Sequence, residues 1–256
     1  MQTFTKYQEK GAYHWRAIGY RNFLKSNPKF SAYYDVALRF VSNQMTVDYP
    51  LGTDIGCGDG VFIYKALQKN LRVVGIDLSW DGLSLANQEL IIHGVKSPSL
   101  VCADGCIVPL SGNSLDYVVA LEMIEHLEQP SIFLDEVARL LKPGGIFVCT
   151  TPRCFSKENG LGDPFHVEEF YPAELRELLY HHFNVVLIKG FCPEWLERAY
   201  KGLTGFRWVD KSLRFAIRIL SLFFNPYSAF VYADVESSSC STLLGIGRVK
   251  SPTNSR

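Results

Sequence analysis

Short apolar runs alternate with longer segments of helical periodicity through the middle of the chain. The runs are rich in β-branched residues, and the segments between them repeat apolar side chains at helical spacing. Strands are predicted at 51–56, 71–79, 97–105, 114–122 and 145–152, with helices at 60–70, 80–94 and 130–145. Apolar strands separated by helices are typical of a parallel sheet covered on both faces, with right-handed crossovers. The pattern therefore predicts an α/β fold on a doubly wound, mostly parallel sheet.

The pattern continues with a helix predicted at 171–183 and strands at 184–191 and 240–250. The segment between these last two strands is far longer than a usual connection. We expect four parts: an N-terminal helical cap at 1–48, a core at 49–191, a helical insertion at 192–236 and a final strand at 237–250.

Composition narrows the class of protein. The 256 residues are 47% hydrophobic, which indicates a folded chain, and the formal net charge of +0 argues against a general nucleic-acid binder. The seven cysteines are odd in number and form no C-x-x-C pair, which favours reduced thiols. The first fifteen residues contain no apolar signal region, so a cytoplasmic location is expected.

A glycine-rich turn follows the first predicted strand. The sequence "DIGCGDG" (54–60) places Gly56, Gly58 and Gly60 where the chain enters a helix, and glycine lets a ligand approach the backbone there. A dinucleotide fingerprint would read G-x-G-x-x-G, whereas this spacing is G-x-G-x-G. Asp54 leads the turn, and its carboxylate would repel a phosphate and attract a cation.

Two more acids stand at the ends of the next strands. Asp77 ends the second predicted strand and could accept hydrogen bonds from both hydroxyls of a ribose. Asp104 ends the third and could accept from an amino group on a base. Since the carboxyl ends of parallel strands meet at one edge, the three acids are expected to line one crevice. Together they predict a nucleoside ligand with a positively charged tail and no phosphates.

The successive motifs resemble those of class I S-adenosylmethionine-dependent methyltransferases, the UbiE/UbiG-like domain superfamily. "DIGCGDG", "GIDLS", "CADG", "LDYVVALEMIEHL" and "FLDEVARLLKPGGIFVCTTP" occur in the family's order across residues 50–190. The resemblance implies a Rossmann-like sheet of seven strands whose last strand is antiparallel. It also implies a cofactor site made of Asp54, Gly56, Gly58, Gly60, Asp77, Leu78, Asp104, Gly105 and Glu122. Thr53 departs from the apolar residue that is usual in the family.

Methyl transfer from a sulfonium needs an aligned nucleophile and, for a weakly acidic hydroxyl, a group that takes its proton. His126 follows the fourth predicted strand, and His166 lies in a loop after the fifth. Both are candidate catalytic bases. The alternatives are that His126 only bonds nearby backbone and that His166 only pins its loop.

A metal site is a further possibility in the same region. If 122–126 form a helical turn, Glu122, Glu125 and His126 share one face, and His166 could complete a site for Mg²⁺, Mn²⁺ or Zn²⁺. The string E-x-x-E-H with a distant His resembles the metal motif of small-RNA 2′-O-methyltransferases and, in part, ubiquinone-biosynthesis O-methyltransferases. Similar strings also occur in relatives that use no metal.

The expected insertion contains one unusual helical pattern. Lys211, Arg214, Arg218, Ser221 and Asn225 form a narrow polar stripe on an otherwise apolar segment, 211–225. Such a helix could lie in a membrane interface with its arginines toward headgroups, or pack as a lid or dimer helix. It is too short and too charged to span a bilayer.

The aromatic residues near the amino end leave two interpretations open. Residues 13–15 and Tyr20 could cap a bound cofactor, although packing in the core is the more common role of such side chains.

The sequence thus predicts an S-adenosylmethionine-dependent O-methyltransferase acting on a small or lipid-linked acceptor, with no nucleic-acid partner and with peripheral membrane contact or a homodimer as options. Two alternatives remain, namely a nicotinamide-dependent oxidoreductase on a similar sheet and a non-catalytic cofactor-binding protein.

Overall fold

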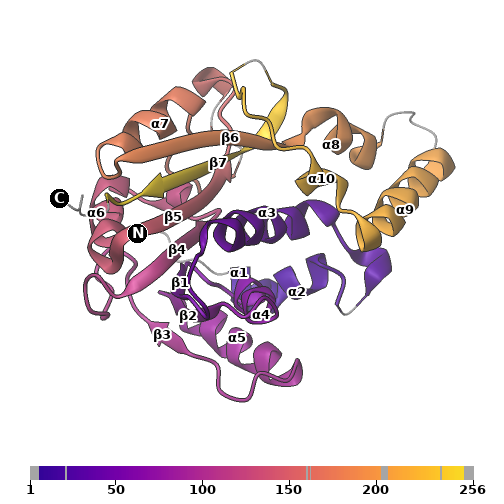
Figure 1. Cartoon of the computed structure of the whole chain (residues 1–256). Helices are drawn as coiled ribbons and strands as arrows, with labels where there is room; N and C mark the ends of the chain where they lie inside the picture. Colours follow the sequence, from indigo (N-terminus) through magenta and orange to yellow (C-terminus); the bar gives the residue numbers. More distant parts are fainter. Residues whose placement is uncertain are drawn as a thin grey trace.

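The computed structural model describes residues 6–20, 22–159, 161, 163–202, 207–236 and 238–250. One seven-stranded sheet has the order β3-β2-β1-β4-β5-β7-β6 (Figure 1). The strands are β1 (Leu51–Ile55), β2 (Arg72–Asp77), β3 (Leu100–Cys102), β4 (Leu115–Leu121), β5 (Leu141–Pro152), β6 (Val185–Pro193) and β7 (Cys240–Arg248). The expected α/β class and seven-stranded sheet are therefore confirmed.

Strand directions fix where a ligand can bind. The strands from β3 to β5 run parallel, and β7 lies antiparallel between β5 and β6. The chain moves outward from β1 to β2 and β3, and then returns to the other side of β1 with β4. Open α/β sheets bind their ligands at such a reversal, so the ligand site is expected outside the carboxyl ends of β1 and β4.

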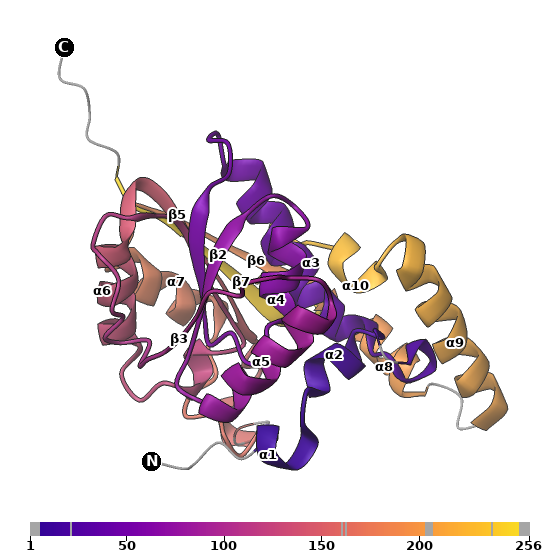
Figure 2. The same ribbon diagram turned by 90° about the horizontal axis from the view of Figure 1, so that it is seen from below.

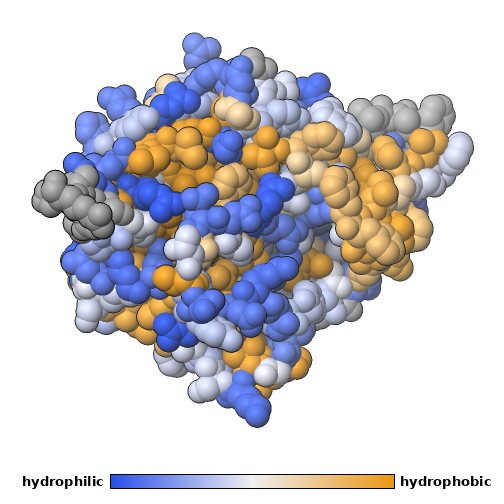
Figure 3. All heavy atoms as spheres, viewed as in Figure 1, coloured by the Kyte–Doolittle hydropathy of each residue, from blue (hydrophilic) through white to orange (hydrophobic). Residues whose placement is uncertain are grey.

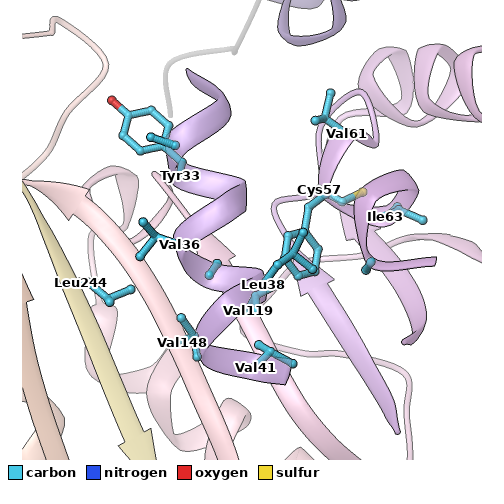
Figure 4. Packing of buried hydrophobic residues seen from close by; sticks show 14 of the residues in the cluster. Tyr33, Val36, Leu38, Val41, Cys57, Val61, Ile63, Val119, Val148 and Leu244 are labelled. Carbon is cyan, nitrogen blue, oxygen red and sulfur yellow. The ribbon is translucent and has the colours of Figure 1, made fainter. Parts of the chain in front are cut away.

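Helices cover both faces of the sheet, as the apolar strands require. On one face lie α3 (Pro28–Gln44), α4 (Val61–Leu67) and α5 (Trp80–Ile92), and on the other α6 (Pro130–Leu140) and α7 (Pro172–Tyr180) (Figure 2). The period of two along β4 serves both layers, because Val119 packs beneath α3 and Val118 contributes to the opposite core. Figure 4 shows Val36 and Val41 of α3 close to Val148 on the sheet.

The helix predicted at 130–145 is shorter than expected. It ends at Leu140, and β5 begins with Leu141, which pairs with Leu115 at an irregular register. The residue before a proline avoids helical backbone, so Lys142 could not continue the helix into Pro143. Pairing with β4 then makes the Pro-Gly-Gly segment part of β5. The predicted stop was therefore too late.

The amino-terminal region is helical and aromatic. It holds α1 (Lys6–Lys10) and α2 (Tyr13–Ala17). Trp15 is fully buried and stacks on His93 at a centroid distance of 4.3 Å, which supports core packing for this residue. Its neighbour His14 instead contacts the loop after β1, as described below.

The segment between β6 and β7 contains α8 (Glu194–Lys201), α9 (Arg207–Phe223) and α10 (Pro226–Ala229). α8 and α10 contact β6, and α9 lies farthest from the sheet (Figure 1). Part of the polar stripe at 211–225 faces the protein, while Lys211 is exposed. Arg218 Nε donates to Ser26 O at 2.8 Å, and Asn225 Nδ2 donates to Pro28 O at 3.0 Å. The expectation of headgroup-facing arginines is therefore wrong for Arg218, because backbone carbonyls of the amino-terminal region satisfy its guanidinium.

The apolar side of α9 faces solvent instead. Trp208 is 72% exposed and Phe223 87% exposed. Figure 3 shows the resulting hydrophobic region over α9 and α10. Among the described residues, no helix is both long and apolar enough to cross a membrane.

Candidate active site

The glycine turn after β1 is closed by β2. The amides of Gly56 and Cys57 both donate to Ile76 O, at 2.8 and 3.0 Å, and the amide of Gly58 donates to Asp77 Oδ2 at 2.8 Å. Gly56 and Gly58 have φ of +77° and +52°, a region that favours glycine. The predicted turn thus forms, and it places Asp77 against the glycine backbone.

The amino-terminal helices cover this turn. A Cβ added to Gly58 would overlap the hydroxyl of Tyr7 and lie 3.0 Å from its Cζ. His14 donates its backbone amide to Asp59 Oδ2 at 3.0 Å, and its Nδ1 lies 3.0 Å from Asp59 Oδ1. The roof formed by α1 and α2 is therefore attached to the glycine turn itself.

The acids below the roof favour a cationic ligand. Asp54 is only 3% exposed, and burial, with Asp77 nearby, raises the pKa of its carboxyl well above the usual value. Burial also raises the pKa of Asp77, against hydrogen bonds from the amides of Ser79 and Gly58 that lower it. A positive charge placed between two such acids would relieve their desolvation and their mutual repulsion.

The other end of the crevice is open and apolar. Asp104 is exposed, and its Oδ1 accepts from the amide of Cys106 at 2.9 Å. Leu78 is 57% exposed and Ile107 is 76% exposed, on the neighbouring strand ends that carry Asp77 and Asp104. Exposed apolar side chains beside a carboxylate suit a flat ring with an amino edge. Ile107 was missed from the sequence because no motif marks it.

The end of β4 separates two sides of the crevice. Met123 faces the glycines, since its Cγ would lie 2.9 Å from a Cβ on Gly56 and its Cε 3.2 Å from one on Gly105. The carboxylate of Glu122 instead interacts with the side chains of Thr150 and Lys29. A place for Glu122 beside the cofactor stays a prediction. Met123 was not expected there, because it carries no chemical signal of its own.

Comparisons with known proteins agree with this geometry. A family model described as "Methyltransferase domain" matches residues 53–149, which include the glycine turn, the strand-end acids and β4. Residues 53–149 are therefore similar to a methyltransferase domain.

Relatives of the methyltransferase domain carry consistent names. A "Probable S-adenosylmethionine-dependent methyltransferase" of Mycolicibacterium smegmatis is 33% identical over 49% of this chain and 48% of its own. A "Ubiquinone biosynthesis O-methyltransferase" of Burkholderia vietnamiensis is 30% identical over 50% of this chain and 56% of its own. The chain therefore spans about half the length of these curated relatives.

A solved structure shows the same fold. Phosphoethanolamine N-methyltransferase 2 of Haemonchus contortus, in complex with phosphomonomethylethanolamine and S-adenosylhomocysteine, has a TM-score of 0.66 at 17% identity. The alignment covers 97% of this chain and 59% of that one.

The two candidate histidines lie together. The ring centroids of His126 and His166 are 5.0 Å apart. His126 Nδ1 lies 2.8 Å from Phe165 O, and His166 Nδ1 lies 2.7 Å from Glu169 Oε1. Burial lowers the pKa of His126 and so favours its neutral form. These contacts attach the loop after β5 to the end of β4, as the loop-pinning alternative describes.

The expected four-residue metal site is only partly assembled. Ligand atoms of Glu125, His126 and His166 all lie within 4.8 Å of one another, and Glu122 is outside the group. The shared helical face is wrong, because Glu122 has φ of +52° and a 3-10 turn begins only at Ile124. Glu125 is instead buried, with Oε2 accepting from Thr151 Oγ1 at 2.9 Å.

A polar cluster beside Glu122 was not foreseen. Lys29 Nζ of α3 lies 2.6 Å from Glu197 Oε1 of α8, and Ser241 at the start of β7 bonds both side chains. Tyr33, one turn after Lys29, is buried nearby, and burial raises its pKa. These residues come from segments far apart in sequence, so no local spacing could reveal them.

Proposed function

We propose that the chain binds S-adenosylmethionine and transfers its methyl group to an oxygen of a small or lipid-linked acceptor. The observation that carries this proposal is the row of three acids beside the glycine turn: buried Asp54, Asp77, which accepts from the amide of Gly58, and exposed Asp104. The cofactor, when bound, supplies an activated methyl on a positively charged sulfur.

The residues fit this cofactor in three ways. Tyr7 packs directly on Gly58, and its hydroxyl occupies the space that a side chain at this position would need. The turn therefore presents only its backbone at this point. Asp54 and Asp77 are desolvated acids that a cationic tail would stabilise. The proposed cofactor residues are those expected from the sequence except Glu122, which is assigned to the acceptor side below: Asp54, Gly56, Gly58, Gly60, Asp77, Leu78, Asp104 and Gly105.

Titration calorimetry with S-adenosylhomocysteine and with NAD tests the cofactor. Binding of the homocysteine product alone supports the proposal, whereas binding of NAD alone supports the oxidoreductase alternative. A screen of cell extract with radiolabelled methyl donor then tests transfer. Binding of the product without methylation of any acceptor would favour a non-catalytic cofactor-binding protein.

The sequence predicts His126 and His166 as proton acceptors, and both stay predictions. The Nδ1 atoms of His126 and His166 contact Phe165 O and Glu169 Oε1. The same two side chains would therefore hold the loop in place and accept the proton. A divalent cation at Glu125, His126 and His166 also stays a prediction. Metal analysis of the purified protein tests it, and full activity in chelator without bound metal would exclude it.

We further propose that α9 contacts an anionic membrane surface, which suits a lipid-linked acceptor. Its exposed apolar residues Trp208 and Phe223 are accompanied by exposed Lys211, while Asp210 is turned inward and only 7% exposed. Exposed aromatic side chains near a basic residue are suited to the interface of an anionic bilayer. This charge arrangement, together with the solvent-facing apolar side, supports a membrane as the occupant.

Flotation with phosphatidylglycerol vesicles tests the contact. Trp208→Ser should lower the bound fraction severalfold. Trp80→Ser is the matched control, since Trp80 is also 72% exposed but lies at the start of α5. Equal loss in both variants, or binding that does not depend on anionic lipid, would contradict the membrane proposal.

A further inference from the structure

Glu122 stands at the carboxyl end of β4 with its side chain on the side away from the glycine turn. Its backbone has φ of +52°, although it is not glycine, and its amide donates to Thr150 O at 3.0 Å. An L-residue held in the left-handed region costs about 1–2 kcal/mol, and such strain persists where the surroundings fix it and is concentrated at functional sites. The fold thus holds the Glu122 backbone in an energetically unfavourable conformation, which directs its carboxylate toward the space between β4, β5 and α3.

The aimed carboxylate lacks a partner on one oxygen. Oε1 of Glu122 is buried and has no hydrogen-bond partner among the described residues. A buried acceptor without a donor is unfavourable in the free protein, and a ligand that brings a hydroxyl would satisfy it. Met123 separates this oxygen from the glycine turn, so the hydroxyl belongs to the acceptor side of the crevice.

We propose that Glu122 Oε1, rather than His126, takes the proton from the acceptor's hydroxyl. The inference rests on the proposed methyl transfer to oxygen and deepens it. The acceptor's O–H bond breaks and its proton passes to Oε1. The oxygen's electron pair forms the new O–C bond, while the pair of the broken C–S bond stays on sulfur. Glu122 then returns the proton to water.

Burial raises the pKa of Glu122 to about 7, with Lys29 and Thr150 lowering it and Glu169 and Glu197 raising it. A carboxylate of this basicity is suited to a phenol at neutral pH and poorly suited to an aliphatic alcohol. Several other charged and titratable groups interact electrostatically with Glu122. They are Lys29, Tyr33 and Tyr34 on α3, Glu125 in the turn after β4, Cys149 on β5, Glu169 in the loop before α7, Cys192 on β6 and Glu197 on α8.

The Lys29–Glu197 ion pair makes the proposal sharply testable, because its two charges act on Glu122 with opposite signs. Removing the cation in Lys29→Met should raise the pKa of Glu122. Removing the anion in Glu197→Gln should lower it, since Lys29 then has no closer acid to pair with. The acid limb of methyl transfer should move with these shifts if Glu122 takes the proton, and should not move with them if Glu122 has only a structural role.

The first measurement needs no acceptor. Protein labelled with ¹³C at the glutamate carboxyl is titrated by NMR as its complex with S-adenosylhomocysteine. A resonance with a midpoint near neutral pH should be present in the wild type, absent in Glu122→Gln, and shifted upward in Lys29→Met and downward in Glu197→Gln. A Glu122 midpoint near the ordinary 4.5, or midpoints that ignore both charge changes, would overturn the proposal.

The second measurement is methyl transfer to phenol, 4-nitrophenol and catechol across pH. Glu122→Gln should lower kcat/KM at least 100-fold, in line with the loss of a general base, with the affinity for S-adenosylhomocysteine changed less than threefold. The pH at which kcat/KM falls on the acid side should match the NMR midpoint in the wild type and should shift with it in Lys29→Met and Glu197→Gln. Retained transfer in Glu122→Gln, with loss only in His126→Gln, would assign the proton to the histidine instead. A wild type that binds no S-adenosylhomocysteine would refute the proposed function itself.

Discussion

Gly58→Ala is the most direct test of the roofed glycine turn. Gly58 has φ of +52°, so an alanine there carries about 1–2 kcal/mol of backbone strain. Its Cβ would also overlap the Tyr7 hydroxyl, and α1 would have to move away from the turn to clear it. We expect both a less stable protein and a Kd for S-adenosylhomocysteine raised at least tenfold, or about 1.4 kcal/mol.

Gly94→Ala separates strain from steric conflict. Gly94 has φ of +89°, but nothing lies within 4 Å of an added Cβ. Both variants should unfold about 2–8 °C earlier, as expected for about 1–2 kcal/mol in a chain of this size. Only Gly58→Ala should lose affinity in titration calorimetry. Equal affinities in the two variants would refute the assignment of this turn and its roof to the cofactor.

Three further outcomes are expected. Asp77→Asn should weaken S-adenosylhomocysteine binding roughly tenfold by calorimetry, because a charged acceptor of two backbone amides is lost. Burial holds the pKa of Glu125 well above its usual value, so Glu125 lowers the stability of the fold as the pH rises above the pKa of this group in the unfolded chain. Glu125→Gln should therefore raise Tm more at pH 8 than at pH 4. An equal gain in Tm at both pH values would contradict this sign. Arg218→Met should cost about 1 kcal/mol in chemical denaturation, since the carbonyl of Ser26 loses one donor and keeps the hydroxyl of Tyr200, and an unchanged midpoint would refute the inward orientation of Arg218.

The sheet and its crevice could be predicted because their causes are local. Continuous apolar strands, the turn glycines and the acids at strand ends each leave a mark within a few residues, and parallel topology brings the strand ends together. The antiparallel last strand came from the family resemblance. The length of α6 was misjudged because pairing of Leu141 with Leu115 is a long-range event.

The side chains around Glu122 could not be predicted, since Lys29 and Glu197 meet only after α3 and α8 pack at the same sheet edge. The orientation of α9 failed for a related reason. A narrow polar stripe indicates that one side of a helix is polar and the other apolar. Which of the two sides packs against the protein depends on whether the rest of the fold offers hydrogen-bond acceptors to the polar side. Here Ser26 and Tyr200 accept from Arg218, and the apolar side is left outside.

The position of β7 sets the order in which the chain can fold during synthesis. β6 pairs only with β7 in the sheet, and β7 is made about 55 residues after β6, several seconds later at about 5–20 residues per second. Until then the open edge of β5 and the unpaired β6 are both exposed on the nascent chain. A ribosome that pauses within the insertion would prolong that exposure, so the codons between β6 and β7 bear on the yield of soluble protein.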